Sequence, residues 1–424
     1  MAHLTPRSAY GRLAERINRF PQGAPPTELL FRILEMLFSE REAGLVALLP
    51  IKPFTAGKAA AVWKTDEAQA RKTLEELAGR GILLDMEVRG KTYYVLPPPM
   101  AGFFEFSLMR VRQNIDQKLL SELFYQYLNV EEDFIKALFA TGKTQLGRTF
   151  VQEPVLTGEN ALHVMDYERA SHVIERSRHI GIGVCYCRHK MEHLGSACDA
   201  PMNICMTFGS TARSLTKHGI AREVDKAQAR DLLQEAYGRD LVQFGENVQR
   251  GVAFLCNCCG CCCEAMIAAR KYGFLEPVHT TNFLPEVSDA DCTGCGRCVS
   301  VCPVDALALA AIGEPEDGSE KVARLDAQVC LGCGVCVRNC REGALSLVPR
   351  PERVLTPLTT THRTVAMAIE RGTLQDLIFD NRVLFSHRAL AALLGVILRL
   401  PPVKQAMAVG QVKSRFTQWL VERG

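Results

Sequence analysis

The chain has 424 residues, room for two to four domains, and 47% of them are hydrophobic, enough for each domain to bury a core. The 50 lysines and arginines nearly balance the 47 acidic residues, so the net charge of +3 excludes a strongly basic or acidic protein. The 18 cysteines occur without an export signal or an apolar window long enough to span a bilayer. We therefore expect a metal-binding protein from an oxygen-poor setting, either cytoplasmic or peripheral on the cytoplasmic side of a membrane.

The N-terminal 26 residues end in a proline-rich stretch, and we expect residues 1–26 to form a loosely attached arm. Three helices and a two-stranded hairpin are then predicted from apolar periodicity and turn residues: helices at 27–37, 55–63 and 66–80, and strands at 82–88 and 92–96. Three helices followed by such a wing resemble a winged helix-turn-helix domain over residues 27–97.

The helix that would enter a DNA groove is not basic. It has four acids and three bases, a net charge of −1: Asp66, Glu67, Glu75 and Glu76 against Arg71, Lys72 and Arg80. Because DNA-reading helices present positive charge to phosphates, we do not expect DNA binding. Partner docking or dimerisation is the preferred role for residues 27–97.

Residues 98–180 are predicted to form a helical connecting region, with helices near 116–128 and 167–178. The aromatic run around Phe103 is interpreted as ordinary core.

A cysteine-rich domain is predicted at 181–286. A strand-like segment at 181–184 leads into four cysteines spaced C-x-C-x10-C-x6-C: Cys185, Cys187, Cys198 and Cys205. An iron–sulfur cluster held by these four is the favoured interpretation. The alternatives are buried free thiols and a zinc site that uses His189 or His193.

The same plan of strand, cysteine loop and helix recurs further along. After a helix at 222–241, a strand at 251–255 leads into six cysteines within eight residues, followed by a helix at 264–272: Cys256, Cys258, Cys259, Cys261, Cys262 and Cys263. Adjacent side chains diverge, so these six cannot all serve one cube. A subset of the six is a candidate to bind a further cluster. The remaining cysteines are then without a ligand role, in contact with the ligands, or catalytic.

Two copies of the run C-x2-C-x2-C-x3-C lie within residues 287–348, each cysteine recurring after 38 residues: Cys292, Cys295, Cys298 and Cys302, then Cys330, Cys333, Cys336 and Cys340. Such dense spacing wraps three sulfurs around a compact object, whereas a zinc site pairs two C-x2-C hooks that lie far apart. We therefore expect two [4Fe-4S] clusters here.

These runs resemble those of bacterial two-cluster ferredoxins, in which the fourth cysteine of each run ligates the other cluster. The resemblance implies two ligand sets. Set I is Cys292, Cys295, Cys298 and Cys340; set II is Cys330, Cys333, Cys336 and Cys302. The second run departs from the family by carrying Arg341 where the first run has Pro303. With the other cysteine motifs, the chain resembles 4Fe-4S dicluster proteins of anaerobes.

Helices are predicted to return in the C-terminal region, 349–424. Residues 381–424 contain seven bases and one acid, a net charge of +6. This tail is a candidate for peripheral contact with an anionic membrane or an acidic partner, and the alternative is a helix that covers the core.

The sequence thus predicts an α+β, multi-domain protein in which a ferredoxin-like domain is inserted beside a cysteine-rich domain. The expected function is electron transfer as an oxidoreductase subunit or carrier, with a separate redox partner, a candidate flavoprotein, because no nucleotide-binding loop is present. Homo-oligomerisation is a further candidate. The alternatives are a redox-sensing winged-helix regulator and a reductase with its own active site at 256–263.

Overall fold

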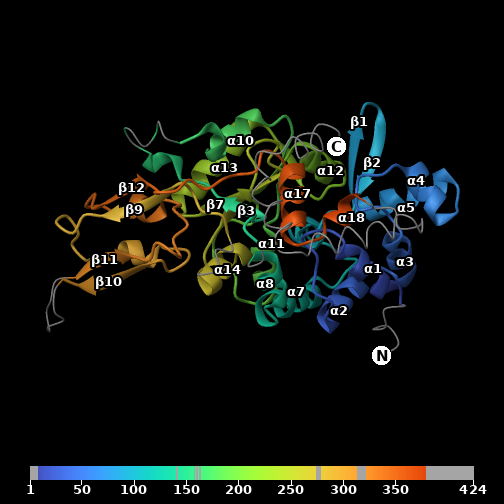
Figure 1. The fold of residues 1–424 in the computed structure, drawn as a ribbon, viewed down its shortest axis with the longest axis horizontal. Helices are drawn as coiled ribbons and strands as arrows, with labels where there is room; N and C mark the ends of the chain where they lie inside the picture. Colours follow the sequence, from blue (N-terminus) through green and yellow to red (C-terminus); the bar gives the residue numbers. More distant parts are fainter. Residues whose placement is uncertain are drawn as a thin grey trace.

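The structure is a computed structural model that describes residues 8–139, 142–156, 158, 161, 164–273, 278–312 and 321–378. It mixes helices and strands, which confirms the α+β class. The described part is elongated: the strands of the ferredoxin region lie at one end, the first helices lie at the other, and a six-stranded sheet lies between them (Figure 1).

The N-terminal region contains five helices and a hairpin: α1 (Ala9–Ile17), α2 (Glu28–Leu37), α3 (Glu40–Ala47), α4 (Ala56–Trp63), α5 (Glu67–Gly79), β1 (Leu84–Val88) and β2 (Lys91–Val95). The three predicted helices are present as α2, α4 and α5, the hairpin is present too, and α1 and α3 are additions. A bridge between Phe54 and Tyr94 extends the hairpin. The winged-helix assignment stays a prediction.

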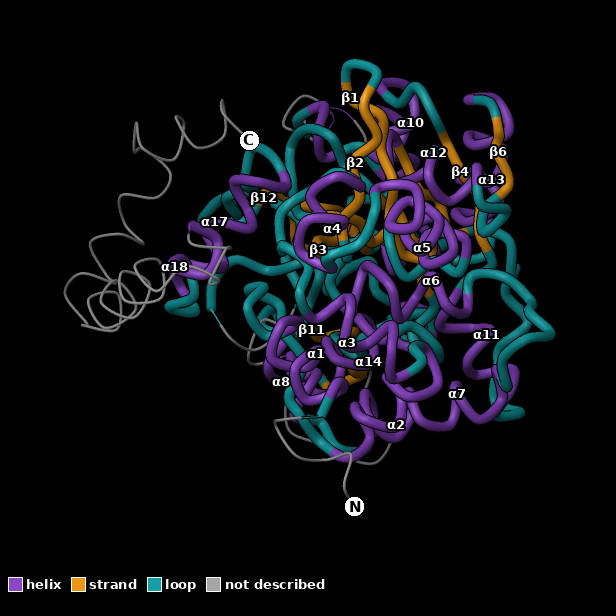
Figure 2. The backbone as a smooth tube through the Cα atoms, turned by 90° about the vertical axis from the view of Figure 1, so that its right-hand side faces the viewer, coloured by secondary structure: helices purple, strands orange, loops and turns teal. Residues whose placement is uncertain are grey.

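The expectation of a loosely attached arm is wrong for residues 8–26. Helix α1 packs against α3, and the side chains of Leu13 and Ile17 are buried. Further along, the buried Gln22 exchanges two hydrogen bonds of 2.8 Å with the backbone of Met100. The apolar face of this amphipathic segment belongs to the helical core. Figure 2 shows α1 beside α3, in the same group of helices as α2 and α7.

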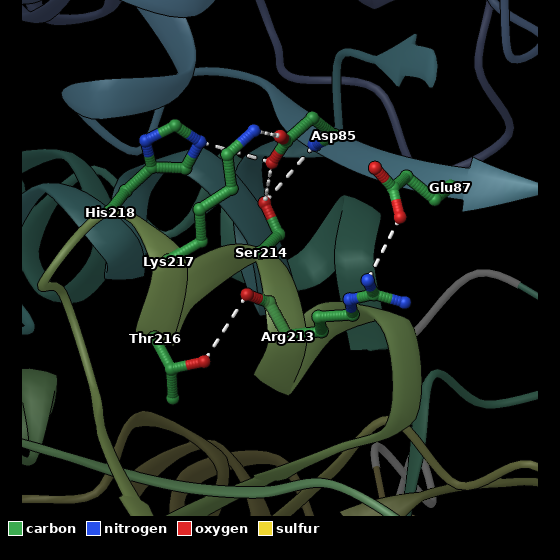
Figure 3. A network of polar contacts seen from close by, with 7 residues as sticks. All are labelled: Asp85, Glu87, Arg213, Ser214, Thr216, Lys217 and His218. Carbon is green, nitrogen blue, oxygen red and sulfur yellow. Dashed lines mark hydrogen bonds and ion pairs between the residues drawn. The ribbon is translucent and has the colours of Figure 1, made fainter. Parts of the chain in front are cut away.

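The hairpin is fixed to the rest of the molecule through Asp85 on β1. Its buried carboxylate accepts hydrogen bonds from Ser214 (2.6 Å) and Lys217 on α12 (Gly209–Lys217), and it contacts His218 at 3.1 Å (Figure 3). Burial opposes ionisation, but hydrogen bonds from His218, Lys217 and Ser214 outweigh it and hold the pKa of Asp85 well below its usual value. The hairpin therefore packs on α12 instead of projecting freely.

The connecting region contains four α-helices: α6 (Phe104–Leu108), α7 (Gln117–Tyr125), α8 (Asp133–Phe139) and α10 (Ala170–Arg176). The prediction of an all-helical connection is wrong at β3 (Gly147–Thr149), a strand that pairs with the central sheet. The aromatic run forms core, since the rings of Phe103 and Phe104 are buried and meet edge to face at 4.9 Å.

The central sheet is antiparallel, with strand order β3-β7-β8-β5-β4-β6. Its strands are β3 (Gly147–Thr149), β4 (Ile180–Gly183), β5 (Cys205–Phe208), β6 (Arg222–Val224), β7 (Val242–Glu246) and β8 (Phe254–Cys258). The predicted helix at 222–241 is wrong at its start, because 222–224 form edge strand β6 before α13 (Lys226–Gly238). Strand β8 also begins later than predicted and includes two cysteines.

The ferredoxin region has two antiparallel hairpins and two short helices. Strands β9 (Phe283–Val287) and β12 (Leu345–Pro349) pair, as do β10 (Leu307–Ala311) and β11 (Lys321–Leu325). The helices α15 (Arg297–Ser300) and α16 (Val335–Asn339) each begin inside a cysteine run and pack together. The sequence repeat thus appears as a structural repeat.

The chain then returns to the centre through α17 (Thr360–Glu370) and α18 (Leu374–Ile378). A buried ion pair of 3.0 Å between Arg363 and Glu246 attaches α17 to strand β7. The basic segment 381–424 lies outside the described residues. Within the described ranges, no helix is both long and apolar enough to cross a membrane.

Candidate iron–sulfur and metal centres

The eight cysteines of the two runs surround two separate cavities. Set I lines one and set II lines the other, so that Cys302 lies with the second run and Cys340 with the first. Because thiolates are the protein ligands of [4Fe-4S] clusters, each set has the donor chemistry for one cluster. Within each set, three cysteines come from one run and the fourth from the other.

Backbone geometry fits the region to a bound group. Gly294 and Gly332 have φ of +63° and +68°, and a Cβ at either would lie within 2.2 Å of a backbone oxygen across the hairpins. Only glycine allows this close return of the chain. Backbone amides also donate to sulfur, from Ala306 to Cys302 at 3.2 Å and from Gly332 to Cys330 at 3.3 Å. Such bonds to sulfur help to set a cluster's potential.

The two sets differ in exposure. In set I, Cys295 is exposed and Cys292 and Cys340 are partly exposed. In set II, three of the four cysteines are buried, and burial raises the pKa of Cys333 to about 12. Set I therefore lies toward solvent and set II toward the protein.

Set II is attached to the central region by hydrogen bonds. The amide of Gln152, just beyond β3, donates to the carbonyl of Cys333 at 2.9 Å. Asn339 at the end of α16 donates to Asp240 beside β7 at 2.7 Å. The ferredoxin region is thus packed against the central sheet at set II.

Sheet topology explains why the central cysteines meet. Strands β4 and β8 both pair with β5 in antiparallel register, so β4 and β8 run parallel and end at the same edge. Cys185 follows β4, Cys205 begins β5, and Cys256 and Cys258 end β8. Each of the two strands continues into a helix, α11 (Tyr186–His193) or α14 (Glu264–Tyr272), whose N-caps are Cys185 and Cys263. Both helix N-termini favour thiolate at this edge.

Six cysteines lie around one cavity, each interacting with the next, and we call them the six-cysteine ring: Cys185, Cys187, Cys263, Cys258, Cys256 and Cys205, returning to Cys185. Within the ring, Cys263 and Cys258 share a hydrogen bond of 3.1 Å between their sulfurs. Contacts between neighbouring thiols lower the pKa of Cys185, Cys256 and Cys263 and raise the pKa of Cys187, Cys205 and Cys258. Every second thiol of the ring is thus favoured as the thiolate, the form that binds metal.

The remaining four central cysteines form a separate four-cysteine group: Cys198, Cys259, Cys261 and Cys262. The sequence-based set of Cys185, Cys187, Cys198 and Cys205 is therefore corrected, because Cys198 lies with the second loop. The expected divergence of adjacent cysteines holds for Cys258 and Cys259, since Cys258 faces the ring while Cys259 faces the group. It fails for Cys261 and Cys262, which are adjacent and both belong to the group, with their Sγ atoms 3.7 Å apart. His189 joins neither, and its Nδ1 lies 2.7 Å from the carbonyl oxygen of Leu108.

Two buried charged contacts that the sequence did not reveal hold this edge together. Arg188 donates to the carbonyls of Pro201 (3.0 Å) and Asn257 (2.8 Å), so it joins both cysteine loops. Although burial opposes it, the negative charge of Cys185 and Cys259 raises the pKa of Arg188. Lys190 on α11 forms a fully buried ion pair with Glu264 on α14.

A cavity of about 90 Å³ adjoins the six-cysteine ring and is lined by all six of its cysteines and by apolar side chains. Glu105 lies on its wall. Burial, followed by the charge of Cys256, raises the pKa of Glu105 well above its usual value.

The second cysteine loop touches the ferredoxin region beside set II. A Cβ at Gly260 would lie 2.6 Å from the carbonyl oxygen of Pro303, the residue after Cys302. Arg270 on α14 spans the same contact, since it donates to the carbonyl of Gly260 at 2.7 Å and pairs with Asp305 at 3.6 Å. No side chain separates the two backbones at this point.

The comparisons with known proteins agree with the geometry of the ferredoxin region. The family profile described as "4Fe-4S dicluster domain" matches residues 291–344, which contain all eight cysteines of sets I and II. The comparison with curated proteins gives no match, and neither does the comparison with solved structures. Residues 291–344 thus form a ferredoxin-type domain that binds [4Fe-4S] clusters.

Proposed function

We propose that this protein is a multi-cluster electron-transfer protein that works as an oxidoreductase subunit or carrier in anaerobic metabolism. The observation that carries the proposal is the contact between Gly260 and Pro303, which joins the ferredoxin region to the loop 256–263, the source of cysteines for both the ring and the four-cysteine group. A domain that only supplied clusters to a solvent-borne partner would not need this contact.

Set I, set II and the six-cysteine ring follow one another through the molecule. Set I lies at the exposed end, set II lies against the central sheet, and the ring lies beyond it at the edge of that sheet. Bound clusters supply one-electron redox capacity, while the chain sets their potentials through burial, charge and hydrogen bonds. This order supports an entry point for electrons at set I, where the exposed Cys295 would face a separate redox protein, a candidate flavoprotein.

A variant at the contact tests the proposal without removing a ligand. Gly260→Val should push the loop away from Pro303, and the iron of the ring should then be reduced several-fold more slowly by a protein-sized donor such as reduced ferredoxin. Rapid mixing followed by EPR measures this rate. Gly238→Ala is the matched control, because a Cβ there meets nothing within 4 Å. Reduction of the ring at the wild-type rate in Gly260→Val would contradict the proposed route.

A reductase with its own active site at 256–263 is the second candidate, favoured by the number of thiols. The ring contains six cysteines, whereas one cube takes four. Two thiols would then remain for chemistry at the cavity. Alkylation of the anaerobic, iron-loaded protein followed by mass spectrometry should label two ring cysteines if this is so, and none if all six bind metal.

The regulator alternative has less support. Its hairpin packs on α12 through Asp85, and two of the three bases of the groove helix are paired, Arg71 with Glu67 at 2.8 Å and Arg80 with Glu42 at 2.6 Å. We therefore propose a docking role for residues 27–97, with self-association as one form of it. The basic tail is proposed to contact an anionic membrane or an acidic partner, which flotation with anionic vesicles would test.

A further inference from the structure

We propose that the four-cysteine group is a structural zinc site, separate from the iron–sulfur centres. Its ligands come from two loops. Cys198 lies in the segment between α11 and β5, which has neither helix nor strand, and the other three follow β8. The inference does not depend on the proposed electron transfer.

The sulfur positions match coordination of one ion. The Sγ atoms lie 3.6 Å apart for Cys198 and Cys259, 3.7 Å for Cys261 and Cys262, and 3.8 Å for Cys262 and Cys198. With Zn–S bonds of about 2.3 Å, neighbouring sulfurs of a regular tetrahedron lie about 3.8 Å apart. All four sulfurs lie within 4.8 Å of one another, so the group is compact in every direction.

A cubane would need a wider arrangement. Its four thiolates bind four different irons, and they therefore lie farther apart than thiolates that share one ion. Across the described ranges, no other set of three or more His, Cys, Asp or Glu side chains is this compact, and that includes sets I and II. The same chain thus has two sulfur spacings, one suited to clusters and one to a single ion.

Four thiolates and no open position are typical of structural zinc, whereas a catalytic zinc keeps a site for water or substrate. Zn²⁺ with four thiolates carries a net charge of −2, and a buried positive group beside it reduces the cost of that charge. Arg188 supplies this charge, and it also donates to Pro201 in the Cys198 loop. A single iron held by the same four thiolates would be a redox centre, and the metal analysis below separates it from zinc.

The site would position the six-cysteine ring. Cys259 and Cys262 are each next in sequence to a ring cysteine, Cys258 and Cys263. An ion bound by the four-cysteine group would therefore fix the backbone that carries these two ring cysteines. It would also hold the segment around Cys198, whose neighbours Ala197 and Asp199 are exposed. Metal binding here would therefore stabilise the fold of this edge.

Metal analysis of the full-length chain, purified anaerobically from cells supplied with iron and zinc, tests the proposal. Wild-type protein should contain about one zinc per chain in addition to iron. Cys198→Ser and Cys261→Ser should lose the zinc and keep most of the iron. Cys295→Ser is the matched control, because Cys295 is exposed like Cys261 but belongs to set I; this variant should keep the zinc and lose iron.

X-ray absorption at the zinc edge uses the wild-type protein alone, so it tests the proposal even if the variants fail to fold. Four sulfur neighbours at about 2.3 Å are expected. A zinc-free wild-type protein, nitrogen or oxygen neighbours in the first shell, or loss of iron with zinc retained in Cys198→Ser would each overturn the proposal.

Discussion

The ferredoxin region and the central sheet both gather cysteines, but they do so by different means. In the ferredoxin region, three ligands of each set come from one short run, and a single crossing residue completes the set. At the central edge, each assembly draws on two loops that are brought together by β4, β5 and β8. Ligand sets encoded by local spacing can be read from sequence, whereas those assembled by tertiary structure cannot.

The largest expected effect comes from removing a ring cysteine. Cys256→Ser should lower the iron content by about four per chain, because the ring would no longer hold a cluster. The EPR signals of the ferredoxin region should remain, since sets I and II do not include this residue. Iron analysis with EPR after reduction measures both. Loss of all iron would show that the two regions assemble together and would contradict the view that their ligand sets are independent.

The division of the ten central cysteines shows where sequence reasoning stops. The spacing C-x-C-x10-C-x6-C suggested one set, but it does not reveal that Cys198 lies in a loop that folds toward Cys259. The divergence of adjacent thiols was predictable from local geometry, and it is seen at Cys258 and Cys259. Which face each thiol takes depends on strand pairing, and this information is distributed over the whole sheet.

The fold shows the same limit. Periodicity identified α2, α4, α5 and the hairpin, because their apolar residues are local and regular. The short N-terminal segment looked like an arm because its partners, such as Met100, are distant in sequence. The burial of Lys190 and Glu264 could not be predicted either, because a single charged residue beside a cysteine motif gives no local sign of burial.

That buried pair provides the second test of the comparison. Lys190→Met leaves the carboxylate of Glu264 buried without its cation, which should destabilise the contact between α11 and α14 by about 3–5 kcal/mol. Iron bound by the ring should be released by a chelator faster than in wild type, while iron in the ferredoxin region should not. The double variant Lys190→Met/Glu264→Met should recover much of the loss. Equal release from both regions would contradict the idea that only the central site depends on this packing.

A third change acts far from both regions, at the hairpin. Asp85→Asn should destabilise the N-terminal region by about 2 kcal/mol, since hydrogen bonds to a buried charge are lost. Because the folded-state pKa of Asp85 is depressed, this contribution is fully present above the unfolded value of about 3.9 and is lost only as pH falls below it. The difference between variant and wild type in urea unfolding, followed by Trp63 fluorescence, should therefore be present at about pH 5 and shrink as the pH falls below about 4. A difference that does not shrink in this acidic range would assign the effect to another group.

The smallest expected effect concerns Arg341, which stands directly after Cys340 of set I and is exposed. Reduction adds a negative charge to a cluster, and a nearby guanidinium stabilises that state. Arg341→Gln should therefore lower one of the two ferredoxin potentials. Because solvent and salt screen an exposed charge, the shift should be on the order of 10 mV.

Redox titration with EPR can show which of the two clusters, that of set I or that of set II, changes its potential. Arg341 belongs to the second run by sequence, but Cys340 lies with the first run around the cavity of set I. If the potential that moves is also the one abolished by Cys295→Ser, the crossing of the fourth ligand holds in solution. If the potential that moves is instead the one abolished by Cys333→Ser, Arg341 acts on the cluster of set II, which is held mainly by its own run. A larger shift at high salt than at low salt would exclude a charge effect altogether, because screening can only weaken it.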